Sequence, residues 1–85
     1  MKIQTTRHFD KGFAALPPAI KERAKEKLAL FIENPQHPSL RVKKMQGHSY
    51  IWEGSITKNY RFTFQIDDDV CILRRIGTHD ILNKP

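Results

Sequence analysis

The sequence has few of the residues on which redox, metal and membrane functions depend. It contains one cysteine, Cys71, so it can form no internal disulfide, and it suits a reducing compartment. No run approaches the roughly 20 apolar residues of a membrane span, and the N-terminal MKIQTTRHFD lacks the apolar centre of a signal peptide. The histidines at positions 8, 37, 48 and 79 have no metal-ligand spacing, and there is no glycine-rich phosphate loop. We expect a cytoplasmic protein with no cofactor, metal or membrane anchor.

Acidic residues are also scarce. Nine of them stand against fifteen Lys and Arg, which gives a net charge of +6 and a sequence pI of about 9.8. This is the range of nucleic-acid-binding domains, although a soluble basic domain or one with an acidic protein partner fits the same charge. A chain of 85 residues with 39% hydrophobic residues predicts one folded domain over 1–85 with a small core.

The first half of the chain predicts a strand and two helices. Residues 2–6 read as a short strand. Apolar residues then recur at helical spacing, with Thr6 as a candidate N-cap. Pro17 and Pro18 end this helix and start a second one, whose apolar stripe is Ile20, Ala24, Leu28 and Phe31, widened by Ile32. Asn34-Pro35 ends it. The two helices are expected to form a hairpin across one face of a sheet.

The second half predicts three strands, over 49–57, from 58 or 60 to 66, and over 70–76, with Gly77 ending the last. Tyr60, Phe62, Phe64 and Ile66 alternate with polar residues, so Arg61 should point away from the helices. The three aspartates at 67–69 read as a turn, and cation binding is the alternative. The expected fold is α+β, with order β-α-α-β-β-β and the helices on one face of a small antiparallel sheet whose other face is uncovered.

The loop over 34–48 concentrates positive charge. Its basic residues include Arg41, Lys43, Lys44 and His48. Apolar and basic residues alternate from 40 to 45, which suggests an extended segment with its basic side outward. Such a segment is either a solvated surface loop or a contact for phosphate groups.

Arg61 and His79 offer a chemistry to match this charge. Arginine binds phosphate and stabilises its transition-state charge, and histidine is the usual acid or base near neutral pH. Together they suit metal-independent cleavage of RNA through its 2′-hydroxyl. The alternatives are that Arg61 only pairs with a carboxylate and that His79 caps the C-terminal segment. Trp52 is interpreted as a packing residue.

Four pieces of the chain together resemble the RelE/ParE superfamily of type II toxin–antitoxin toxins. They are the helical hairpin, the ENP-x-HPSLRVKKMQG loop, the W-x-x-x-I-T-K-N-Y-R-F-T-F block and the R-I-G-T-H-D ending. The resemblance, strongest to RelE, YoeB and YafQ, implies a RelE-like fold, an antitoxin partner and cleavage of mRNA in the ribosomal A site. The resemblance also implies that Arg61 contacts the scissile phosphate and that His79 is the catalytic histidine. RNA contacts would come from Arg41, Lys43, Lys44, His48 and Lys58.

The sequence also departs from the family. Leu82-Asn83 stands where many members have an aromatic residue that stacks on a base. Glu53 lies where RelE carries lysines, and it is a further candidate base. A ParE-like inhibitor of DNA gyrase and a non-catalytic, antitoxin-binding member remain alternative functions, and His79 favours the nuclease over the gyrase inhibitor.

Overall fold

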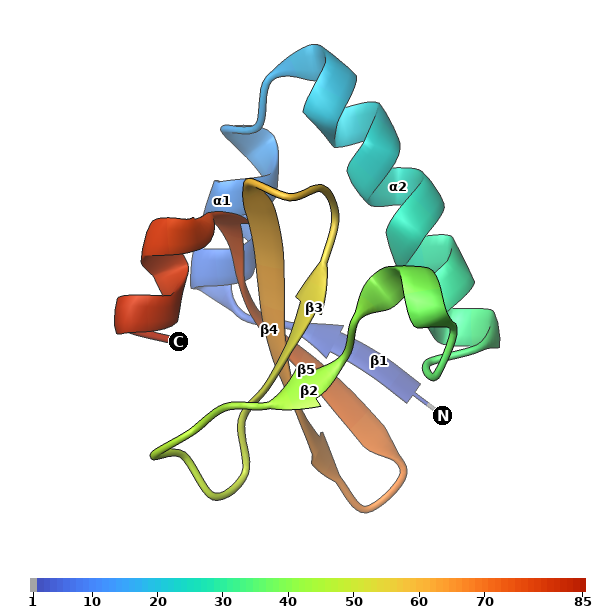
Figure 1. The fold of residues 1–85 in the computed structure, drawn as a ribbon, viewed down its shortest axis with the longest axis vertical. Helices are drawn as coiled ribbons and strands as arrows, with labels where there is room; N and C mark the ends of the chain where they lie inside the picture. The colour runs from blue at the N-terminus through green and yellow to red at the C-terminus, as the bar shows by residue number, and fades with distance from the viewer. Residues whose placement is uncertain (1) are drawn as a thin grey trace.

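The computed structural model describes residues 2–85 as two helices on a five-stranded sheet (Figure 1). The elements are β1 (Lys2–Thr5), α1 (Arg7–Ala14), α2 (Pro18–Glu33), a 3-10 turn η1 (Pro38–Leu40), β2 (Lys43–Lys44), β3 (Trp52–Ser55), β4 (Tyr60–Asp67), β5 (Val70–Thr78) and a second 3-10 turn η2 (His79–Asn83). The α+β class and the predicted element order are confirmed, with β2 as an additional short strand.

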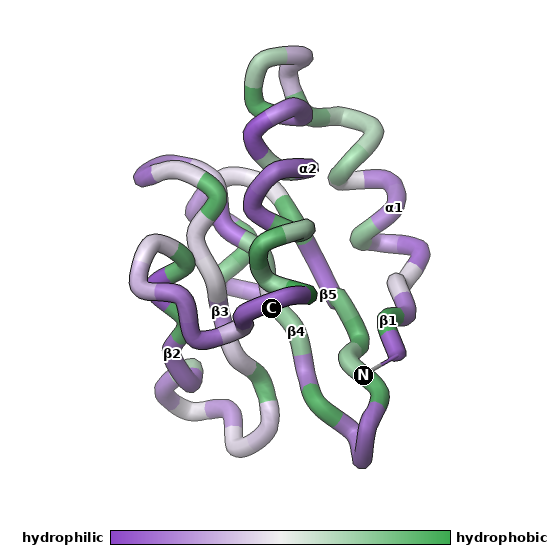
Figure 2. The backbone as a smooth tube through the Cα atoms, turned by 90° about the vertical axis from the view of Figure 1, so that its right-hand side faces the viewer, coloured by the Kyte–Doolittle hydropathy of each residue, from purple (hydrophilic) through white to green (hydrophobic). Residues whose placement is uncertain are grey.

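The sheet has the order β1-β5-β4-β3-β2. The pairs from β2 to β5 are antiparallel, as predicted, because short turns join β3, β4 and β5. β1 joins the edge beside β5 and runs parallel to it, since two helices carry the chain across before the next strand. The sheet is therefore mixed and not wholly antiparallel. Figure 2 shows the two edge strands, β1 and the hydrophilic β2, on opposite sides of the hydrophobic centre.

The helices begin and end where the sequence predicts. The Phe9 amide donates a hydrogen bond to the Thr6 side chain at 3.1 Å, which caps α1. Pro17 and Pro18 separate the helices, and Pro18 occupies the first turn of α2, where a missing N–H costs nothing. α1 packs so closely against β5 at Gly12 that a Cβ atom there would be only 2.3 Å from the Ile76 carbonyl oxygen.

Both helices cover the same face of the sheet. One buried cluster contains Phe9 of α1, Phe31 of α2, and Phe62 and Phe64 of β4. The ring centroids of Phe31 and Phe64 are 4.7 Å apart, and those of Phe31 and Phe62 are 5.3 Å apart. The alternation predicted for β4 is thus confirmed. It continues to Ile66, which remains 46% exposed because the helices do not reach that far.

The opposite face of the sheet is partly covered, which contradicts the expectation of an open face. Thr63 alternates with the helix-facing aromatic residues, yet it is fully buried. Its hydroxyl donates to the Pro85 backbone oxygen at 3.1 Å, and the Arg74 Nε donates to the same oxygen at 3.2 Å. The segment after β5 folds back over this face. Figure 1 shows it, in red, on the side of the sheet away from α2.

A β-bulge interrupts the pairing of β4 with β5. Thr63 pairs with Arg75 and Phe64 pairs with Leu73, so Arg74 is the extra residue. Leu73 and Ile76 are both buried in the core. In a regular strand, residues three positions apart point to opposite faces of the sheet, so only one of the two could be buried. The bulge lets both fill the core and turns the two arginines between them to the opposite face.

Three predicted boundaries are wrong. β3 is only Trp52–Ser55, because residues 45–51 form a loop after β2. Gly77 does not end β5, which pairs with β4 through Thr78. The segment from 40 to 45 is not uniformly extended, because Leu40 closes η1 and Arg41 adopts a left-handed conformation with φ 47°. Its basic side chains nevertheless point outward, and Leu40 is buried.

Candidate nucleic-acid interface

A positively charged cleft of about 550 Å³ lies where α2, η1 and the β3–β4 turn meet. We call it the basic cleft. Its charged lining residues are Arg23, Lys27, Arg41, Lys58 and Arg61. No carboxylate is among its lining residues, and like charges this close favour an anion between them. Three of the predicted phosphate contacts, Arg41, Lys58 and Arg61, therefore meet in one place.

Arg61 is held on two sides. Its Nη1 donates to the Glu53 carboxylate at 3.4 Å, while its Nε and Nη2 donate to the Lys58 carbonyl at 3.3 and 3.1 Å. The Glu53 side chain is 8% exposed and that of Arg61 is 16% exposed. Arg61 points away from the helices as predicted, and its pairing with a carboxylate, which the sequence left open, is real. Two of its five N–H groups remain for a ligand.

Ser55 supplies a buried polar atom at the same cleft. Its side chain lines the basic cleft, and its hydroxyl oxygen is buried without a hydrogen-bond partner in the described chain. Because Ser55 is directly opposite Arg61 in the sheet, the two side chains share a face. An unpaired buried hydroxyl is costly, and a phosphate oxygen would satisfy it.

His79 stands beside the turn that positions Arg61. Its backbone N–H donates to the Asn59 carbonyl at 3.1 Å, one residue along from the carbonyl that Arg61 binds. β4 and β5 bring this about by pairing Tyr60 with Thr78. His79 is exposed and is the first residue of η2. His79 itself is not among the lining residues of the basic cleft, so only its backbone contact with the β3–β4 turn relates it to Arg61.

The remaining predicted contacts do not line the basic cleft. Lys43 and Lys44 form β2 and are exposed, with Lys43 opposite Glu53 and Lys44 opposite Trp52. Lys43 therefore shares the sheet face of Glu53, and Lys44 lies on the helix-facing side. His48 lines a separate cleft beside Arg74 and Arg75.

Sequence reasoning missed Arg23, Lys27 and Ser55. Arg23 and Lys27 lie four residues apart on α2, so they share one helix face, and their spacing was the one available signal. How α2 crosses the sheet decides whether that face meets Arg61. The sequence does not show which side of β3 faces the core, so it could not place Ser55 beside Arg61. The pairing of Ser55 with Arg61 in the sheet shows that the two share a face.

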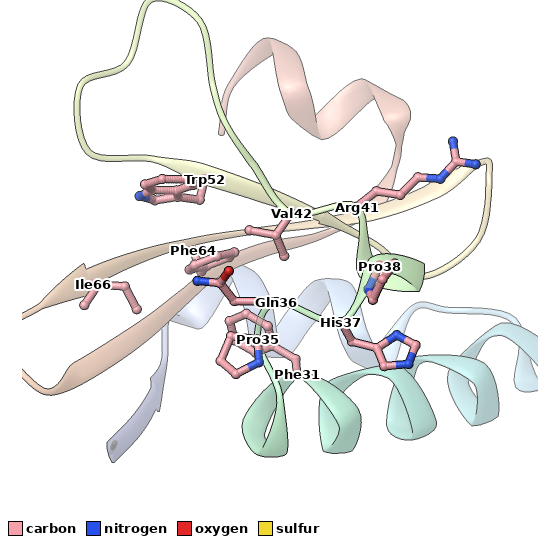
Figure 3. Close-up of a pocket in the computed structure, with 10 residues that line it drawn as sticks. All are labelled: Phe31, Pro35, Gln36, His37, Pro38, Arg41, Val42, Trp52, Phe64 and Ile66. Carbon is pink, nitrogen blue, oxygen red and sulfur yellow. The ribbon is translucent and has the colours of Figure 1, made fainter.

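An apolar groove of about 390 Å³ lies on the other side of Arg41 (Figure 3). Trp52, Phe64 and Ile66 line one end, and His37 and Arg41 line the other. Trp52 also packs against the core, which confirms its predicted role. Arg41 lines both the groove and the basic cleft, so the two hollows are neighbours.

The described residues offer neither a metal-binding cluster nor a membrane-spanning helix. Within residues 2–85, no three His, Cys, Asp or Glu side chains gather in a way that could hold a metal ion. None of the helices in that range has the length and apolar character needed to cross a bilayer. Asp68 and Asp69 form the β4–β5 turn, with Asp68 at φ 55°, while Asp67 is the last residue of β4 and pairs with Val70.

Solved structures share this architecture. YafQ from E. coli superposes with a TM-score of 0.79 at 17% identity, over 95% of this chain and 96% of that one. The fold is that of the RelE/ParE-superfamily toxins. RelE from Methanococcus jannaschii, in complex with the antitoxin RelB, gives 0.72 at 19% identity over 95% of each chain. The YoeB/ParE toxin from Agrobacterium tumefaciens gives 0.77 at 14%, over 93% and 99%.

The likeness to RelE/ParE toxins is one of structure more than of sequence. No protein-family model matches the chain, and no curated protein matches it. YafQ has also been crystallised in a DinJ-YafQ toxin–antitoxin complex, which superposes equally well, with a TM-score of 0.79. The RelE-like fold predicted from the sequence is thereby confirmed.

Proposed function

We propose that this protein is the toxin of a type II toxin–antitoxin pair and that it cuts mRNA on the ribosome. The observation that carries the proposal is the basic cleft, in which Arg61 stands beside a buried carboxylate with four other cations around it. The shared fold with YafQ and RelE supports it. The net charge of +6 suits an RNA substrate.

The proposed reaction is an internal transfer within the RNA. The 2′-oxygen attacks phosphorus and the bond to the 5′-oxygen breaks, leaving a 2′,3′-cyclic phosphate and a 5′-hydroxyl. A base must take the 2′-hydroxyl proton, and an acid must protonate the leaving 5′-oxygen. We assign the base to Glu53, the acid to His79 and the stabilisation of the phosphate charge to Arg61. Arg41, Lys58, Lys43 and Lys44 hold the strand, and His48 contacts it further along.

Cleavage in a reconstituted translation system tests this function. Ribosomes stalled on a defined mRNA should give cuts within the translated region, with 2′,3′-cyclic phosphate ends. His79→Ala and Arg61→Ala should abolish the cuts, while Lys25→Ala, which removes an exposed charge on α2 away from the basic cleft, should not. Full cleavage by both site variants would refute the assignment. Inhibition of gyrase supercoiling without RNA cuts would instead favour the ParE-like alternative.

The proposed protein partner is an antitoxin with an amphipathic, acidic segment. Such a segment matches two adjacent features. Its apolar side chains would fill the groove beside Trp52 and Ile66, and its carboxylates would bind Arg41 and enter the basic cleft. Ile66 is 46% exposed and lines the groove, so it is available to such a partner. Occupying both hollows would block the proposed active site.

Co-expression with the product of the adjacent reading frame tests the partner. Ile66→Asp should weaken the complex, because it places a carboxylate in the apolar groove, and it should leave mRNA cleavage intact. Ile32→Asp is the matched control, since Ile32 is also exposed but does not line the groove. Equal weakening by both variants would argue against docking in the groove, and harmless expression without any antitoxin would argue for a non-catalytic protein.

A further inference from the structure

A second positively charged cleft, of about 480 Å³, lies on the sheet face opposite the helices. We call it the tyrosine cleft. The residues that define it are His8, His48, Tyr50, Arg74, Arg75 and Lys84. They come from α1, the loop before β3, β5 and the segment after η2. No Asp or Glu side chain lines this cleft, although Pro85, whose oxygen accepts from Arg74, does. Four separate parts of the chain thus direct basic side chains to one place.

The bulge in β5 makes this cleft possible. Regular alternation would put only one of Arg74 and Arg75 on this face, and the bulge puts both there. Neither belongs to one of the two salt bridges of residues 2–85, which join Lys25 to Glu22 and Arg61 to Glu53. Arg74 is engaged by the Pro85 oxygen and by Gln65, so the partly buried Arg75 is the arginine of this pair whose charge an anion would neutralise.

Arg74 is held in place by hydrogen bonds and packs over an aromatic ring. Its guanidinium donates to the Gln65 side chain and to the Pro85 oxygen. It also lies over the Tyr50 ring, 5.9 Å from the ring centroid. Tyr50 is 56% exposed, which is unusual for a large aromatic residue without a partner. The other ring face has no counterpart among the aromatic pairs of the described residues.

We propose that the tyrosine cleft binds single-stranded RNA, with a base stacked on Tyr50 and a neighbouring phosphate held by Arg75 and Lys84. An exposed ring beside a basic groove is how proteins bind single strands without reading sequence. Tyr50 thereby supplies the stacking surface that Leu82-Asn83 does not. The proposal rests on the proposed function for its choice of RNA. It adds a binding site for the strand on the same sheet face as Glu53, because Lys43, Glu53, Thr63 and Arg75 are successive cross-strand partners.

Binding of a labelled single-stranded RNA to the purified protein, followed by fluorescence anisotropy, tests the site. Tyr50→Ala should weaken binding by about 5- to 150-fold, the range for losing one stacked base, and Tyr50→Trp should restore it. Arg75→Ala should lower the slope of log affinity against log salt by about 0.7, the value for one phosphate on a single strand. Ile32→Ala and Lys11→Ala, which remove an exposed apolar group and an exposed charge elsewhere, should change nothing. Thermal melting of each variant checks the fold.

Several results would overturn the proposal. The first two are that the wild type does not bind single-stranded RNA, or that Tyr50→Ala binds it with the same affinity as the wild type. The other two are that the protein binds the same sequence more tightly as a duplex, or that it binds an acidic peptide through Tyr50 in place of RNA. The failure of the two proposals is distinguishable. If Tyr50-dependent binding occurs without mRNA cleavage, the nuclease assignment fails and the binding site stands. If the wild type cuts mRNA and Tyr50→Ala binds and cuts identically, the binding site fails alone.

Discussion

The Glu53 carboxylate lies 3.4 Å from the Nη1 of Arg61, and both side chains are largely buried. Water therefore compensates neither charge well if the other is removed. The pair joins β3 to β4, and the Lys58 carbonyl completes the support of the guanidinium. The same two residues carry the proposed chemistry, so stability and activity are linked at this point.

Substitutions can distinguish the contributions of Glu53 and Arg61 to stability from their contributions to activity. Arg61→Ala should destabilise the protein by about 3–5 kcal/mol, because it leaves a buried carboxylate without its partner, whereas Glu53→Gln should cost less, because the amide oxygen can still accept from Arg61. Urea unfolding measures both. The double substitution to Ala should cost less than the sum of the single ones. If Glu53→Gln also keeps full cleavage, Glu53 is not the base.

Gly12→Ala should destabilise the protein, although alanine is favoured over glycine by about 1 kcal/mol in an exposed helix. The added Cβ would meet the Ile76 backbone oxygen at 2.3 Å, so α1 would have to move off β5. Ala14→Gly, at an exposed position of α1, is the control in which the propensity alone acts. A melting temperature that rises for Gly12→Ala would show that α1 is packed less tightly than described.

Arg41→Gly should raise stability while it lowers affinity for RNA and antitoxin. Arg41 has φ 47°, a conformation that costs an ordinary residue about 1–2 kcal/mol and glycine little. Asp68→Gly is the matched control, because Asp68 also has a positive φ, of 55°, and lines neither the groove nor the basic cleft. It should raise stability to a similar extent without changing either affinity. Loss of stability in Arg41→Gly would mean that the side chain is needed for the loop itself.

The single thiol should be inert until the protein unfolds. Burial raises the pKa of Cys71 from 9.0 to about 11, and the side chain is fully buried. The folded protein holds the thiol proton more tightly than the unfolded chain. This contribution to stability is present below about pH 9 and is lost as the pH rises towards 11, by about 2–3 kcal/mol in total. Urea unfolding of wild type and Cys71→Ala across this range measures the difference, and a thiol reagent should react only in denaturant.

The parts of the fold that depend on neighbouring residues were predictable from the sequence. Thr6, the two prolines and the alternation in β4 each act over a few residues, so their pattern is visible in the chain. The placement of Arg61 away from the helices followed from that alternation. β2 is only two residues long, and the fold of the final segment over Thr63 depends on contacts between distant residues. No local pattern encodes either of these.

The candidate site was predictable in part. The sequence names Arg41, Lys58 and Arg61 as phosphate contacts, and only the structure shows that they line one cleft together with Arg23 and Lys27 of α2. How α2 packs on the sheet decides that. One overlooked signal was local. Leu73 and Ile76 are both apolar with two arginines between them, and regular alternation cannot bury both, so their burial in the core requires the bulge.

That bulge has a consequence for how related chains can vary. Deleting either Arg74 or Arg75 would restore regular pairing and keep Leu73 and Ile76 in the core, since a single residue would then separate them. A one-residue deletion elsewhere in a strand exchanges its buried and exposed sides; here it would change only the number of positive charges on one face. Relatives of this protein can therefore gain or lose a basic residue at this position through insertion or deletion, with the hydrophobic core conserved.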